Sequence, residues 1–152
     1  MQILPDLDPP LRPAAAARFL GRPGWGLSFA QQAELAGEVM AILDHPDFAP
    51  LFGPSSRAEV PVVGQVGERI LSGQIDRLLV TDREVVVVDY KTNRPPPRDV
   101  AAVAPVYLKQ MAAYRAALAC VYPGRIIRCV LLWTDVPTLM PLESRLLDDL
   151  MG

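Results

Sequence analysis

The pattern of apolar positions predicts three consecutive strands in the middle of the chain. Residues 59–66, 69–80 and 85–91 are rich in β-branched and aliphatic side chains, which is typical of strands. Gly67 turns the chain between the first two strands, and the polar residues 81–84 predict a hairpin turn between the second and the third. The third strand carries an unbroken run of valines, which indicates a strand covered on both faces.

The N-terminal part is predicted to contain two helices. Residues 1–27 are rich in Pro, Ala and Arg, and we expect irregular structure there with a short helix over 14–20. Ser28 is a suitable N-cap for a longer helix over 28–44, which His45-Pro46 ends. The apolar residues of this helix recur at the spacing of one helical face. They are Phe29, Ala33, Ala36, Met40 and Leu43.

After the strands, the chain is predicted to pass through a helix into another buried strand. Residues 93–99 are rich in proline, and three consecutive prolines exclude a helix or a central strand. Pro105 suits the first turn of a helix that runs to Val121. Residues 126–133 then form a buried strand, and residues 143–150 form a short helix. The predicted order of elements is α-β-β-β-α-β.

Length, composition and charge narrow the classes of function. The chain has 152 residues, enough for one domain with its own core, which we place at 28–152 after the segment 1–27. Although 51% of the residues are hydrophobic, no run reaches the roughly 18 apolar residues of a membrane-spanning helix, and no signal peptide pattern opens the chain. We therefore expect a cytoplasmic protein. Because the net charge is only −2, binding to nucleic acid has to be local.

Cysteine and histidine are too few for a zinc or iron-sulfur site made by this chain alone. Cys120, Cys129 and His45 are the only residues of these two types. Both thiols are expected to be buried and reduced, as is usual in a cytosolic setting.

Two carboxylates and a lysine are predicted to converge on the second and third strands. If the hairpin loop is Asp82-Arg83, antiparallel pairing places Asp76 directly opposite Asp89. Opposed residues have Cβ atoms roughly 5 Å apart, and like charges there are destabilising unless a cation offsets them. Lys91 lies two residues after Asp89, so strand alternation places it on the same face. We therefore predict a divalent metal site with an adjacent ammonium group, the chemistry of phosphodiester cleavage.

Three motifs, in this order, resemble those of a nuclease family. They are Gly73-Gln74-Ile75-Asp76-Arg77-Leu78, Asp89-Tyr90-Lys91-Thr92 and, on the following helix, Gln110-Met111-Ala112-Ala113-Tyr114. Together they are similar to the RecB-like branch of the PD-(D/E)xK phosphodiesterases. More narrowly, residues 89–97, 107–118 and 129–135 resemble the C-terminal nuclease part of AddA-type helicase-nuclease subunits. The resemblance covers roughly residues 57–142. It implies a restriction-endonuclease-like α/β fold with an αβββαβ core, in which helices flank a mixed central sheet.

The resemblance also implies an activity and the residues that carry it. It implies a metal-dependent DNA nuclease in which Asp76, Asp89 and the main-chain carbonyl of Tyr90 hold one or two magnesium or manganese ions. Lys91 would orient the attacking water or stabilise charge on the phosphate in the transition state. Gln110 and Tyr114 lie near the active centre and the DNA in this family, although residues four apart on a helix also fit a packed rim.

A further acid and several cations near the motifs are additional candidates. Glu59 opens the first strand and is equally suited to be a further metal ligand or a solvated strand end. Four cations surround the site in sequence and would offset phosphate charge without reading base sequence, although many such clusters are only solvated faces. They are Arg94, Arg98, Lys109 and Arg115.

The resemblance further implies partners and a cellular role for a longer protein. AddA-type subunits act on DNA together with an AddB-like subunit in double-strand-break repair and recombination, and their helicase part uses ATP. No G-x-x-x-x-G-K-[ST] phosphate loop occurs in this chain, so ATP binding is expected only outside it. No membrane partner is expected.

One departure from the family leaves other interpretations open. The histidine that RecB-like members commonly carry in an upstream helix has no recognisable counterpart here, and we do not equate His45 with it. The chain is therefore expected to be a truncated fragment of a longer protein. The alternatives are a catalytically silent nuclease-like module that binds DNA or a partner protein, and a stand-alone nuclease of the same fold.

Overall fold

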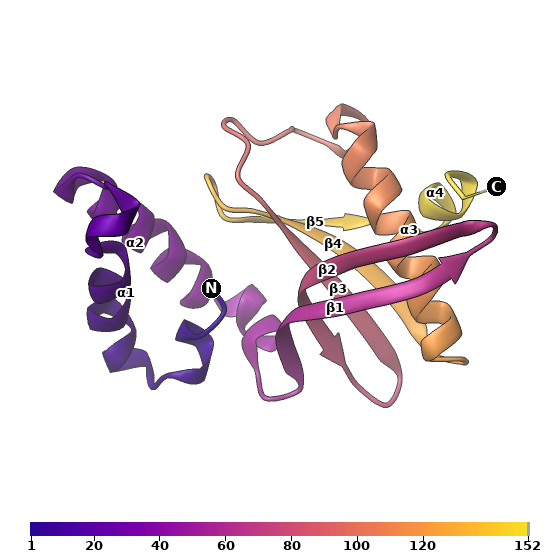
Figure 1. The fold of residues 1–152 in the computed structure, drawn as a ribbon, viewed down its shortest axis with the longest axis horizontal. Coiled ribbons are helices and arrows are strands. Elements are labelled where there is room, and N and C mark those ends of the chain that lie inside the picture. Colours follow the sequence, from indigo (N-terminus) through magenta and orange to yellow (C-terminus); the bar gives the residue numbers. More distant parts are fainter. Residues whose placement is uncertain (152) are drawn as a thin grey trace.

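A mixed five-stranded sheet with helices on both faces forms the centre of the molecule (Figure 1). The computed structural model describes residues 1–151, except the side chains of Val66 and Arg69. The strands are β1 (Ser56–Val66), β2 (Arg69–Val80), β3 (Glu84–Lys91), β4 (Ile126–Trp133) and β5 (Thr138–Leu142). The α-helices are α1 (Arg12–Leu20), α2 (Phe29–Leu43), α3 (Pro105–Val121) and α4 (Ser144–Asp149).

Strand order in the sheet follows strand order in the chain. β1, β2 and β3 form an antiparallel meander, β3 and β4 are parallel, and β5 is antiparallel to β4. A parallel pair needs a crossover connection, which α3 supplies. The predicted α/β class with a mixed sheet is confirmed, and β5 is an addition to the predicted order.

The hairpin of β2 and β3 has the predicted register. The Thr81 amide donates to the Glu84 carbonyl at 2.9 Å, so the loop is formed by the two residues between them. The ladder ends at the pair of Arg77 and Val88. Beyond this pair, side chains rather than ladder bonds connect the two strands. The candidate functional residues lie at this end of the hairpin.

A separate apolar layer covers each face of the sheet. α3 and α4 cover one face, where Met111 of α3 is fully buried. The end of α2, with Ile42, and the 3-10 segment Pro46–Phe52 cover the other face. Residues 85–88 of β3 alternate between the two layers, and all four are buried. The prediction that this strand is covered on both faces is therefore confirmed.

Local sequence explains the boundaries of the two long helices. Ser28 and Gln31 form a capping box at the start of α2, and α2 ends at Leu43, just ahead of Pro46. Pro105 is the first residue of α3. These boundaries agree with the predicted ones to within a residue. No helix in the described part of the chain is long and apolar enough to cross a membrane.

The predicted apolar stripe of α2 is buried only near its end. Phe29 is 90% exposed and Ala33 is also exposed, whereas Ile42 and Leu43 are buried. The periodicity identified an apolar face, but only the last turn of α2 packs against the sheet layer. The predicted apolar stripe of α2 is therefore covered only over its last turn.

The sheet extends further than predicted at both of its edges. β1 begins at Ser56, three residues before the predicted start. β5 has only five residues and contains Pro141, which favours irregular structure over a strand. A proline is tolerated there because β5 is an edge strand, where Pro141 faces Val130 of β4.

Two isoleucines of β2 provide a matched test of how this strand is oriented. Ile75 is fully buried under α3, whereas Ile70 is 83% exposed. Ile75→Ala is expected to lower the free energy of unfolding by about 2–5 kcal/mol, because it leaves a cavity in the core. Ile70→Ala is expected to change it by less than about 0.5 kcal/mol. Urea unfolding followed by circular dichroism measures both values, and similar losses would contradict the orientation.

Candidate active site

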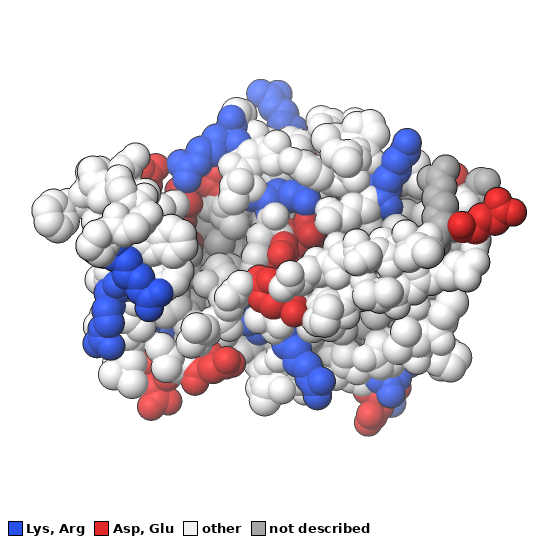
Figure 2. Space-filling model, viewed as in Figure 1, with Lys and Arg blue, Asp and Glu red and all other residues white. Residues whose placement is uncertain are grey.

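Two acids and a lysine lie together where the β2–β3 ladder ends. Asp76 belongs to β2, and Asp89 and Lys91 belong to the end of β3. α3 passes over the same end of the sheet and contributes Gln110 and Tyr114. Figure 2 shows acidic side chains near the middle of one face, where the N-terminal helices meet the sheet. The structure thus brings together the five residues that the sequence predicts as catalytic.

Asp89 and Lys91 form a buried ion pair. Their side chains are 5% and 11% exposed, and Lys91 Nζ contacts Asp89 Oδ2. This oxygen accepts no hydrogen bond of ordinary geometry. Lys91 Nζ also donates to Gln110 Oε1 at 3.3 Å and lies 3.9 Å from the centre of the Tyr107 ring. A carboxylate, an amide and an aromatic face thus offset the cost of removing the ammonium from water.

Asp76 is held by the main chain of β3. The Tyr90 amide donates to Asp76 Oδ2 at 2.7 Å. Burial raises the pKa of the Asp76 carboxyl above its ordinary value, the Tyr90 hydrogen bond offsets part of this shift, and the charges of Asp89 and Glu59 raise the pKa further. The negative charge of Asp76 is therefore poorly compensated. A bound cation would stabilise it.

A local break in strand alternation accompanies the position of Asp76. Ile75 and Leu78 both lie in the layer under α3, although residues three apart on a regular strand face opposite sides. On the neighbouring strand, Glu59 has a φ of 53°, and the β1–β2 ladder skips the position where it would face Asp76. The register that brings Asp76 level with Asp89 is as predicted, but the Asp76 carboxylate contacts the main chain of β3.

A chain of hydrogen bonds connects Lys91 to α3 and back to β2. Gln110 accepts from Lys91 through Oε1 and donates through Nε2 to the Tyr114 hydroxyl at 3.3 Å. The Tyr114 hydroxyl in turn donates to the main-chain carbonyl of Gln74 at 3.0 Å. Gln110 and Tyr114 therefore do more than pack as a rim, because together they fix the position of the Lys91 ammonium.

This network depends on a glycine in β2. A Cβ atom at Gly73 would lie 2.7 Å from the Tyr114 hydroxyl oxygen and 3.0 Å from Cε1 of the ring. Only glycine leaves room for the ring to approach the strand so closely. The first residue of the motif on β2 thus accommodates the last residue of the motif on α3, a link that the sequence alone does not reveal.

Comparison with known families agrees with the fold. The family model for the PD-(D/E)XK nuclease superfamily matches residues 14–135. The chain belongs to this superfamily. Its mixed five-stranded sheet with flanking helices is consistent with the restriction-endonuclease-like fold of PD-(D/E)XK nucleases.

Two solved structures are also similar to the chain. One is the crystal structure of SSO0001, with 17% identity and a TM-score of 0.38, covering 79% of this chain and 67% of that one. Another is protein VC1899 from Vibrio cholerae, with 17% identity and a TM-score of 0.38, covering 82% of this chain and 31% of that one. No curated protein matches the chain significantly.

The oxygen donors of the site fit the divalent ions that PD-(D/E)XK nucleases generally use. Asp76, Asp89 and the main-chain carbonyl of Tyr90 offer hard oxygen ligands, the type that magnesium and manganese prefer. Asp89 Oδ2 is buried without an ordinary hydrogen bond, and burial, together with the charges of Asp89 and Glu59, raises the pKa of the Asp76 carboxyl. Among residues 1–151, no three His, Cys, Asp or Glu side chains are grouped closely enough to hold a metal. Main-chain oxygen and water would therefore complete the ligand set.

Glu59, the further candidate ligand, is directed towards β2. It lies inside β1 rather than at its end and is only partly exposed. The side-chain amide of Gln74 donates to its carboxylate. Its charge acts on Asp76, but it does not complete a ligand cluster with Asp76 and Asp89.

The four cations predicted to bind phosphate fall into two groups. Arg94 pairs with three carboxylates, from α2 and from the segment after β4, at 2.5–3.5 Å. Arg115 pairs with Asp148. These carboxylates compete with phosphate for both arginines. Arg98 and Lys109 are exposed and form no ion pair within the described part of the chain, so they are the better placed of the four to meet a phosphate.

Arg77, which follows Asp76 directly, is a residue at the site whose role the sequence motifs do not reveal. Its side chain is buried and donates to the Tyr90 hydroxyl at 3.2 Å. The available signal was an arginine inside an otherwise aliphatic strand, since arginine is rarely buried without a specific partner.

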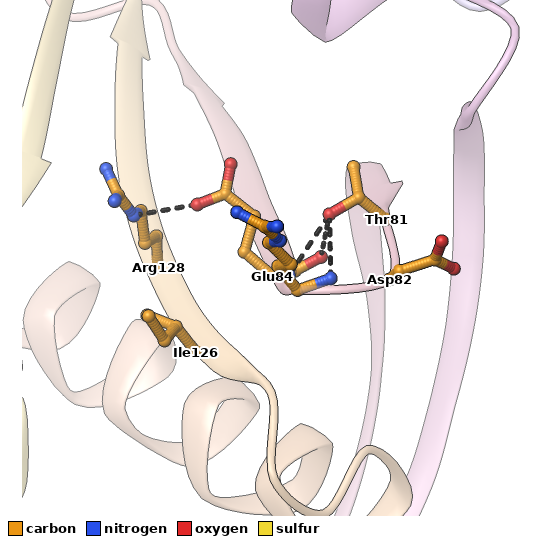
Figure 3. A pocket seen from close by; sticks show the side chains of 6 residues that line it. Thr81, Asp82, Glu84, Ile126 and Arg128 are labelled. Carbon is orange, nitrogen blue, oxygen red and sulfur yellow. Dashed lines mark hydrogen bonds and ion pairs between the residues drawn. The ribbon is translucent and has the colours of Figure 1, made fainter.

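Two surface cavities lie at different distances from the site. Thr81, Glu84 and Arg128 line a cavity of about 530 Å³ at the β2–β3 turn (Figure 3). Glu84 lies at the opposite end of β3 from Lys91, roughly 23 Å away at the usual rise per residue. A second cavity, of about 540 Å³, lies among the N-terminal segment, α1 and α2, and Glu59 and Tyr90 line it as well. Only the second cavity reaches the neighbourhood of the acids.

Gly73→Ala tests the close contact between β2 and α3. The added methyl group has to displace the Tyr114 ring, so we expect the free energy of unfolding to fall by about 1–3 kcal/mol. Gly64→Ala on β1 is the matched control, because its Cβ would meet nothing nearer than the Ala117 Cβ at 4.0 Å. Chemical denaturation compares the two variants, and equal stabilities would show that the contact is not close.

Asp76→Asn tests the uncompensated charge. Because the pKa of Asp76 is raised from 3.8, the folded state binds more protons than the unfolded state above that pH, and stability falls as pH rises through the folded pKa. The variant keeps an oxygen for the Tyr90 amide but no charge, so it should become more stable relative to the wild type as pH rises. Thermal unfolding between about pH 4 and pH 8 measures this trend, with Asp82→Asn in the exposed turn as control. A difference that does not change with pH would contradict it.

Proposed function

We propose that the chain is a metal-dependent deoxyribonuclease domain that hydrolyses phosphodiester bonds. Membership of the PD-(D/E)XK superfamily supports a nuclease-like function. The observation that carries the proposal is the buried pair of Asp89 and Lys91 beside Asp76. Burying these charged groups together costs free energy that folding alone does not require. Perturbed, convergent acids of this kind are characteristic of catalytic sites.

The residues of the site have distinct roles in this proposal. Asp76, Asp89 and the carbonyl of Tyr90 would hold magnesium or manganese, which would supply an activated water and Lewis-acid polarisation of the phosphoryl oxygen. Lys91 contacts Asp89 Oδ2, and Gln110 provides a second acceptor for its ammonium group. Held by these two residues, the ammonium would be close enough to stabilise negative charge on the phosphate in the transition state.

We further propose that this domain is the C-terminal nuclease part of an AddA-type, RecB-like helicase-nuclease subunit. The order of the three motifs supports this assignment, as do the contacts that join them through Gly73, Gln110 and Tyr114. In that setting the domain is an exonuclease that acts on DNA in double-strand-break repair and recombination in the cytoplasm. An AddB-like subunit is the expected partner, and ATP is used only by the helicase part.

Metal binding and DNA cleavage measured on the same samples test the proposal. Titration calorimetry with magnesium and with manganese is expected to show binding by the wild type and loss of binding in Asp76→Ala and Asp89→Ala. Cleavage of labelled single-stranded DNA should be lost in the same two variants. Lys91→Ala is expected to retain metal binding and to cleave about 10²–10³-fold more slowly, because it removes only transition-state stabilisation.

Asp82→Ala is the control for these variants, since it removes an exposed acid at the far end of the hairpin. It should bind metal and cleave DNA as the wild type does. Full metal-dependent cleavage by clean Asp89→Ala protein would refute the assignment. A folded wild type that binds DNA, but neither binds metal nor cleaves the DNA, would instead indicate a catalytically silent binding module.

A further inference from the structure

We propose that Arg77 is a positioning residue that holds Tyr90, and with it the main chain of the metal site, against β2. The inference rests on the proposed nuclease function, because it assigns Tyr90 to the metal site. Arg77 forms no ion pair with any carboxylate in the described part of the chain, and it is not proposed to contact metal or substrate. Its effect on the reaction is therefore exerted through Tyr90.

The guanidinium group of Arg77 is buried, and its hydrogen-bond partners are neutral groups. Only 2% of the residue is exposed. Nε donates to the Tyr90 hydroxyl at 3.2 Å, Nη1 to the Ser56 hydroxyl at 2.5 Å and Nη2 to the Met1 carbonyl at 3.2 Å. The group also lies 5.0 Å from the centre of the Phe52 ring. Burial of a charge without a counter-ion is a poor way to stabilise a fold, so a positional role explains this arginine better than packing does.

On its β2 side Tyr90 has no ladder partner, although the ladder between β3 and β4 continues through it. The last ladder pair between β2 and β3 is Arg77 with Val88. Past that pair, the Tyr90 amide donates to the Asp76 side chain at 2.7 Å, and the Tyr90 hydroxyl accepts from Arg77. Two consecutive residues of β2 therefore hold Tyr90 at its main chain and at the tip of its ring.

The position of Tyr90 determines the geometry of the acids. Tyr90 lies between Asp89 and Lys91, so a shift of its peptide moves both side chains of the ion pair. On the α3 side of the sheet, Gln110 holds the Lys91 ammonium. On the other side, Arg77 holds the Tyr90 ring, which packs against the second apolar layer. The site is thus fixed from both faces of the sheet, as a preorganised site requires.

Amide hydrogen exchange in the metal-free protein tests the positioning directly. Tyr90→Phe removes only the hydroxyl that Arg77 holds, and Arg77→Lys keeps the charge but loses the fork of donors. Both variants are expected to speed exchange at the amide of position 90 by about 2- to 10-fold, the effect of one hydrogen bond. The amides of residues 85–88 should exchange as in the wild type. Tyr122→Phe, at the far end of α3, is the matched control and should change the exchange rate neither at position 90 nor at residues 85–88.

A second readout connects the positioning to the site. Manganese affinity is expected to fall by about 2- to 10-fold in Tyr90→Phe and to be unchanged in Tyr122→Phe. An unchanged exchange rate at the amide of position 90 in Tyr90→Phe overturns the inference. Equal acceleration of exchange at the amides of residues 85–88 also overturns it, because it indicates a general structural role. If Arg77→Lys does not fold, Tyr90→Phe decides alone. A wild type without metal binding or cleavage refutes the proposed function, whereas the exchange result still decides whether Arg77 positions Tyr90.

Discussion

The buried ion pair between Asp89 and Lys91 is the interaction on which the rest of the structure depends. Removing a carboxylate and an ammonium from water costs several kcal/mol per ion and is repaid only by good geometry and further hydrogen bonds. The fold supplies both through its topology. β3 and β4 are parallel, so a crossover helix has to follow β3, and that helix is α3. Because α3 returns over the end of β3, its Gln110 reaches the Lys91 ammonium.

β2 is adapted to the same end of the sheet at three positions. Gly73 leaves space for Tyr114, Asp76 takes the place of a ladder partner for the Tyr90 amide, and Arg77 contacts the Tyr90 hydroxyl. None of these features strengthens a regular strand: glycine weakens one, and a break in alternation interrupts the ladder. Such irregularities occur next to active sites because they direct side chains that a regular strand could not. The irregular features of β2 are thus better explained by the needs of the site than by poor packing.

Much of this arrangement could be predicted from the sequence, because it is encoded by short-range patterns. The valines 85–88, the turn after Thr81 and the proline at the start of α3 each specify their element through neighbours along the chain. The contact between Gly73 and Tyr114 could not be predicted, since it depends on how a helix packs on a strand forty residues earlier in the sequence. The same reason explains the exposed Phe29, because periodicity identifies an apolar face but not the part of it that a neighbour covers.

The two acids of the site differ in how the chain compensates their charge, and this difference bears on how metal binding and folding are coupled. Asp89 contacts an ammonium group directly, whereas Asp76 is held by a main-chain amide, and its burial raises the pKa of its carboxyl. At the proposed metal site a cation would therefore gain most from Asp76, while at Asp89 it would compete with Lys91. A ligand that binds only the folded state stabilises that state in proportion to its affinity. If the proposed site binds a metal, the free energy that the fold loses by keeping Asp76 partly buried and charged would be recovered in that binding.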